Sequence, residues 1–109
     1  LTGVDFVREV DHSLAPGGLY ILNCGDGPSL DGARAEVAAL FEVFEQVCLV
    51  ADAAMLKGRR RGNIIIAASH SPLPAAGSAE AAAISRTLMG GGVPAQYRDS
   101  AQARQFARL

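Results

Sequence analysis

Three short apolar runs constrain the fold of this chain more than any other feature. They are Leu19–Cys24, Val47–Ala51 and Asn63–Ala68. In the first run the apolar residues follow one another without regular alternation, which is typical of a strand covered on both faces in a largely parallel sheet. The third run contains Ile64, Ile65 and Ile66, whose β-branched side chains suit a pleated surface better than a helix. The three runs therefore predict three strands with helices packed against them.

Helical patterns surround these runs. Residues 2–14 and 29–44 carry apolar side chains at spacings of three and four with charged side chains between them, which predicts two amphipathic helices. An alanine-rich segment from about Ser78 to Met89 predicts a third helix, which ends at the glycines 90–92. A short helix is also expected near Ser100–Leu109. The predicted order is helix, strand, helix, strand, strand and helix, followed by a tail.

The connection between the second and third runs predicts how those strands run. The segment Lys57–Gly62 is short, whereas a parallel crossover needs about a dozen residues or more, usually with a helix. The second and third strands are therefore predicted to be antiparallel. Lys57 and the arginines 59–61 are interpreted as a solvated turn, because a basic turn also discourages strand pairing at a sheet edge.

Composition limits the partners and the location that can be expected. The 109 residues suffice for one domain, and 50% of them are hydrophobic against 19% charged, so the chain is expected to fold. The formal net charge of -1 argues against a nucleic-acid partner. No apolar run approaches the roughly 20 residues that span a bilayer, and the first residues do not resemble a signal peptide. A cytoplasmic location is therefore expected.

Two carboxylates follow predicted strands. Asp26 comes after the first strand and Asp52 after the second. If these strands are parallel, both residues lie at the same edge of the sheet, where open α/β folds bind ligands. Together they could bind a cationic amine through charge-assisted hydrogen bonds. The competing interpretation is that each aspartate forms a turn or caps a helix.

Several segments in this order resemble the C-terminal half of the spermidine synthase family, the polyamine aminopropyltransferases. The resemblance covers roughly residues 1–70 and is carried by Leu1-Thr2 before the helix with Phe6, the turn Leu14–Gly18, the strand end Leu22-Asn23, the long helix through Phe44, and Gly62-Asn63 opening a strand that ends at Ser69. It implies an α/β fold, the C-terminal half of a Rossmann-like sheet of an S-adenosylmethionine-dependent transferase. The last of three strands would be antiparallel and inserted between the other two, with helices on the flanks.

The resemblance also implies a division of the chain and a spacing of its cysteines. Residues 1–89 would be the C-terminal portion of the transferase domain, and residues 90–109 a C-terminal tail. Cys24 and Cys48 would lie on strands separated by a third strand, about 10 Å apart, which is too far for a disulfide.

The function implied by the resemblance is transfer of an aminopropyl group from decarboxylated S-adenosylmethionine, a co-substrate, to putrescine or a related amine. In the family the donor-binding loop and the catalytic aspartate come earlier in the sequence than the part matched here. The chain is therefore expected to contain no catalytic, cofactor-binding or metal-binding residue and to be inactive alone. Asp26, Asp52, Met55 and Leu56 are the residues expected beside the amine substrate.

Two other functions stay open at this point. An S-adenosylmethionine-dependent methyltransferase would share the sheet and the donor site, and a non-catalytic assembly or binding module could keep the fold without the reaction. Self-association into a homo-oligomer is also expected, because Tyr20, Ile21 and Leu22 would lie on a strand left without its neighbour.

Overall fold

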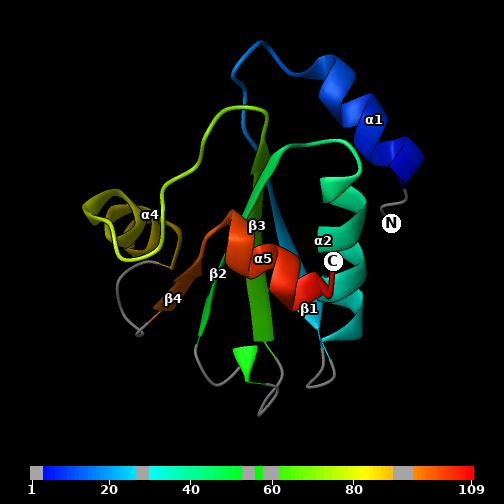
Figure 1. Ribbon diagram of the computed structural model, residues 1–109. Coiled ribbons are helices and arrows are strands. Elements are labelled where there is room, and N and C mark those ends of the chain that lie inside the picture. Colours follow the sequence, from blue (N-terminus) through cyan, green and yellow to red (C-terminus); the bar gives the residue numbers. More distant parts are fainter. Residues whose placement is uncertain (1–3, 27–29, 53–55, 58–61, 90–94) are drawn as a thin grey trace.

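The structure, a computed structural model, describes residues 4–26, 30–52, 56–57, 62–89 and 95–109 (Figure 1). Its helices are α1 (Val4–Ser13), α2 (Asp31–Phe41), α4 (Ala79–Met89) and α5 (Ser100–Ala107). Its strands are β1 (Tyr20–Asp26), β2 (Gln46–Asp52), β3 (Gly62–Ser69) and β4 (Ala95–Arg98). The three apolar runs correspond to β1, β2 and β3, and the predicted helices correspond to α1, α2, α4 and α5.

The strands form one sheet in the order β1-β3-β2-β4. Strand β3 is antiparallel to both of its neighbours, and its Ala67 lies opposite Ile21 of β1 and Cys48 of β2. Strands β1 and β2 therefore run in the same direction on either side of β3. The predicted antiparallel insertion of the third strand is confirmed.

The sheet has four strands, and the prediction of three was wrong. Strand β4 pairs antiparallel with β2, with Tyr97 opposite Val50. It is only four residues long and is half-buried throughout, so it shows neither an apolar run nor an alternation that would reveal a strand. Its extended conformation depends on pairing with β2 and on the Tyr97 hydroxyl, which donates a hydrogen bond to the Pro74 carbonyl at 2.6 Å.

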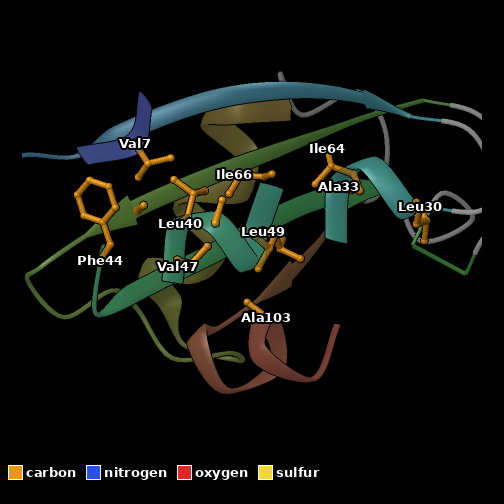
Figure 2. Close-up of a cluster of buried hydrophobic side chains, with 14 residues drawn as sticks. Val7, Leu30, Ala33, Leu40, Phe44, Val47, Leu49, Ile64, Ile66 and Ala103 are labelled. Atoms are coloured by element: carbon orange, nitrogen blue, oxygen red, sulfur yellow. The ribbon is translucent and has the colours of Figure 1, made fainter. Parts of the chain in front are cut away.

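The main core lies between the sheet and helices α2 and α5 (Figure 2). Alternate residues of the strands point into it, and α2 supplies the side chains that face them. The buried side chains are those of Val7, Leu30, Ala33, Val37, Leu40, Phe44, Val47, Leu49, Ile64, Ile66 and Ala103. Among the described residues, none of the helices combines the length and the apolar character that crossing a membrane requires.

Helix α4 packs against the opposite face of the sheet. Ile21, Ala67 and Cys48 form a row across β1, β3 and β2, and their neighbours along each strand point into the main core. This row forms part of an apolar groove of about 230 Å³, together with residues of α4. Cys24 and Cys48 lie on opposite sides of β3, and no disulfide joins these two described residues, as the resemblance implied.

Two cation–π contacts join α5 to α2. The guanidinium carbon of Arg34 in α2 lies 4.7 Å from the ring centre of Phe106, and that of Arg104 in α5 lies 4.2 Å from the ring centre of Phe41. Arg34 also donates a hydrogen bond to the Phe106 carbonyl. Each helix thus contributes one cation and one ring, and these contacts hold α5 against α2.

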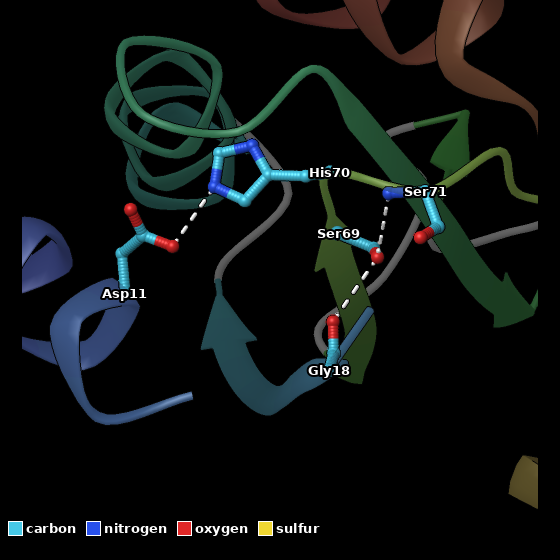
Figure 3. A network of polar contacts seen from close by, with 5 residues as sticks. All are labelled: Asp11, Gly18, Ser69, His70 and Ser71. Carbon is cyan, nitrogen blue, oxygen red and sulfur yellow. Dashed lines mark hydrogen bonds and ion pairs between the residues drawn. The ribbon is translucent and has the colours of Figure 1, made fainter. Parts of the chain in front are cut away.

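A polar network joins α1 to the end of β3 (Figure 3). His70 Nε2 lies 2.8 Å from Asp11 Oδ1. The Ser69 hydroxyl donates to the Gly18 carbonyl at 3.1 Å and accepts from the Ser71 amide at 3.0 Å. The network lies at the end of the sheet where β3 finishes, which is opposite the end where β1 and β2 finish.

Candidate functional site

Asp26 and Asp52 occupy corresponding positions at one edge of the sheet. Each is the last residue of its strand, and β3, which begins at Gly62, lies between those strands (Figure 1). Asp26 lies opposite Gly62, and Asp52 lies opposite Ala95 of β4. Two strand spacings place their backbones about 10 Å apart. Both strands therefore end at the same end of the sheet, as predicted, and the role of these two residues in binding stays a prediction.

The two apolar residues expected beside the substrate have different outcomes. Met55 lies outside the described residues, as do residues 58–61 of the basic turn. Leu56 is half-buried against the core, and Lys57 is exposed. Leu56 also forms part of a cavity of about 260 Å³, which we call the α5 cavity, whose other lining residues are Arg98, Gln102, Gln105 and Phe106.

Sequence reasoning missed four of the five lining residues of the α5 cavity. Gln102, Gln105 and Phe106 are spaced by three and four, so they share one face of α5, and Arg98 ends the strand just before this helix. The spacing was visible in the sequence. Its significance depends on where α5 packs, because the same spacing on a detached tail would face only water.

A capping box holds the start of α5 beside this cavity. The Asp99 carboxylate accepts hydrogen bonds from the amides of Gln102 at 3.0 Å and Ala76 at 3.2 Å, and the Gln102 side chain accepts from the Asp99 amide at 3.0 Å. The backbone amides of Gln102 and Ala76 lower the pKa of Asp99 below its usual range. Helix α5 and the segment before α4 are therefore held together through one carboxylate.

Replacing Asp99 with alanine is expected to lower the free energy of unfolding by about 1 kcal/mol at neutral pH, because the helix loses its N-cap. The Asp99→Asn variant keeps a capping oxygen and is expected to lose less. Since folding lowers the pKa of Asp99, its ionised form stabilises the fold above the unfolded pKa of roughly 4, and this contribution is lost as pH falls through the folded value. Urea unfolding at neutral and acidic pH measures both effects. If the free energy of unfolding fell equally on acidification in wild type and in Asp99→Asn, the assignment of this pH dependence to Asp99 would be contradicted.

The thiol of Cys48 is not an activated nucleophile. It is buried on the face that packs against α4, and burial raises its pKa, although a hydrogen bond with Tyr97 opposes the shift. Burial and the nearby Cys48 also raise the pKa of Tyr97, whose hydroxyl is already bonded to Pro74. Both groups are therefore neutral near pH 7 and contribute to packing rather than to acid–base chemistry.

Comparison with known proteins gives one match in structure. The chain superposes on the crystal structure of a probable spermidine synthase from Corynebacterium glutamicum ATCC 13032 with a TM-score of 0.88. The two sequences are 53% identical, and the match covers 97% of this chain. The predicted resemblance to a spermidine synthase-like protein is therefore confirmed. No protein-family model matches the chain, and no curated protein does.

The matched region is a limited part of the neighbouring structure. This chain covers 38% of the length of the Corynebacterium glutamicum protein. The match spans α1 to α5, so it includes β4 and α5 as well as the part whose resemblance was visible from the sequence.

Proposed function

We propose that this chain is the C-terminal, substrate-side portion of an aminopropyltransferase. The reaction is transfer of an aminopropyl group from decarboxylated S-adenosylmethionine to putrescine or a related amine. The observation that carries the proposal is 53% identity to a probable spermidine synthase over 97% of this chain. Because the chain corresponds to 38% of that protein, donor binding and proton removal are assigned to parts of the enzyme outside these 109 residues.

The exposed edge of β1 supports the assignment of this chain to a larger sheet. Strand β1 is an outer strand, and among the described residues no strand pairs with its outer edge. Leu19 is 46% exposed and Ile21 is 48% exposed beside the groove formed with α4. An edge strand flanked by apolar side chains is suited to pairing with a further strand. We assign that position to the part of the enzyme that binds the donor.

The chemistry of alkyl transfer to an amine defines what the residues at the end of the sheet with Asp26 and Asp52 must do. The unprotonated amine nitrogen attacks the carbon next to the sulfonium, the N–C bond forms as the C–S bond breaks, and the sulfur leaves as a neutral thioether. The attacking nitrogen then loses a proton to a base. A diamine carries a second, protonated nitrogen, and we assign its binding to Asp26 and Asp52 through charge-assisted hydrogen bonds. Their role is to position the amine for attack.

A chimaera tests this role. The chain replaces the part of the Corynebacterium glutamicum protein that it matches, and Asp26→Asn and Asp52→Asn are introduced separately. Each is expected to raise the KM for putrescine about tenfold, because one charge-assisted hydrogen bond is weakened, with a smaller change in kcat. Asp5→Asn, at an exposed carboxylate of α1, is the control and is expected to leave both constants unchanged. An unchanged KM in both edge variants would remove these residues from the amine site.

The same β1 edge supports the proposal that the isolated chain forms a homo-oligomer. Sedimentation velocity of the isolated chain is expected to reveal species larger than a monomer. Ile21→Lys is expected to shift the distribution towards monomer, because a charge on an edge strand opposes strand pairing. Phe6→Lys, at a side chain of α1 with the same 48% exposure, serves as the control. A clean monomer of the unmodified chain, or equal effects of the two lysines, would contradict the proposal.

A further inference from the structure

We propose that the α5 cavity binds a small organic monocarboxylate, with Arg98 holding its carboxylate. The cavity has a volume of about 260 Å³ and is lined by Leu56, Arg98, Gln102, Gln105 and Phe106. This size is just below the usual range for ligand pockets, which suits a molecule of roughly ten non-hydrogen atoms.

The charge of the lining favours an anion. Among the five described residues that line the cavity, Arg98 is the single charged one, and none of these five is an aspartate or a glutamate. Within the described part of the chain, Arg98 has no ion-pair partner. Its Nη2 donates to the neutral amide oxygen of Gln96 at 3.0 Å. A guanidinium carries five N–H donors, so most of the donors of Arg98 remain available to a carboxylate.

The other lining groups complete a site for a carboxylate with an apolar body. The side-chain oxygen of Gln102 already accepts from the Asp99 amide, so its NH₂ group is the part that can serve a ligand. Leu56 and Phe106 supply apolar surface, and the contact of Arg34 with the Phe106 ring holds that ring in place from α2.

The same features separate this cavity from the proposed amine site. A diamine would be repelled by Arg98, whereas the aspartates at the sheet edge would attract it. Inorganic phosphate carries more than one negative charge on average at neutral pH, and one guanidinium would leave part of that charge uncompensated. In the described lining, one cation lies with two side-chain amides and two apolar side chains, which matches a ligand with one negative charge.

Titration of the ¹⁵N-labelled chain with benzoate tests the proposal by nuclear magnetic resonance. Benzoate is expected to shift the side-chain amide signals of Gln102 and Gln105 and the Nε–H signal of Arg98. Benzamide has the same shape without the charge and is expected to bind at least about tenfold more weakly, because a hydrogen bond to a charged group is lost. Inorganic phosphate is expected to bind more weakly than benzoate.

Two variants complete the test. Arg98→Gln is expected to weaken benzoate binding at least about tenfold. Arg86→Gln removes an exposed cation of α4 and is expected to bind benzoate as the unmodified chain does. Absence of benzoate shifts at the cavity, or equal affinity for benzoate and benzamide, would overturn the proposal. The benzoate titration and the comparison of benzoate with benzamide both use the unmodified chain, so they test the proposal even if Arg98→Gln perturbs folding. Tighter binding of phosphate would overturn the assignment to a monocarboxylate.

Discussion

Replacing Ala103 with aspartate is expected to lower the free energy of unfolding by about 3 kcal/mol or more, because a charged group enters the core without a partner. Ala103 is 0% exposed and belongs to the cluster that fills the space between α5 and the sheet (Figure 2). The total stability of a domain of this size is only about 5–15 kcal/mol, so the loss is a large part of it. Urea unfolding followed by circular dichroism measures the change.

Ala101→Asp is the matched control for this variant. Ala101 is in the same helix and is exposed, and its replacement with aspartate is the same chemical change as at Ala103. A negative charge near the start of a helix is mildly favourable, so the free energy of unfolding is expected to change by less than about 0.5 kcal/mol. Equal losses in the two variants would contradict the packing of α5 against the core. The pair therefore tests the part of the structure that sequence reasoning treated as a tail.

The sequence was most informative where apolar side chains follow a regular pattern. The runs within β1, β2 and β3 and the spacing along α2 reflect burial in the main core, which selects apolar residues at each inward position. The short connection before Gly62 then constrained the direction of β3. Once the directions of the strands are known, Asp26 and Asp52 are placed at the same end of the sheet.

The sequence was least informative where structure depends on a neighbour. Strand β4 is extended because it pairs with β2, and the residues Ala95–Arg98 carry no pattern of their own. The α5 cavity depends on this packing too, since Arg98 and Gln102 meet Leu56 only when the end of the chain folds back beside β2. No local pattern specifies such a contact between distant segments.

The position of this chain within a larger enzyme can be examined with the isolated polypeptide and the chimaera side by side. In the chimaera, the outer edge of β1 is expected to pair with the remainder of the Corynebacterium glutamicum protein, because the chain matches that protein with a TM-score of 0.88. Isolated, the chain keeps the sheet edge with Asp26 and Asp52 and is expected to have no turnover.

Aminopropyl transfer by the chimaera is the most direct measurement of the central claim. With decarboxylated S-adenosylmethionine and putrescine, the chimaera is expected to form spermidine and the thioether product, as the intact Corynebacterium glutamicum protein is expected to do under the same conditions. The isolated chain is expected to form neither. A folded chimaera without activity beside an active intact protein, or robust turnover by the isolated chain, would contradict the account.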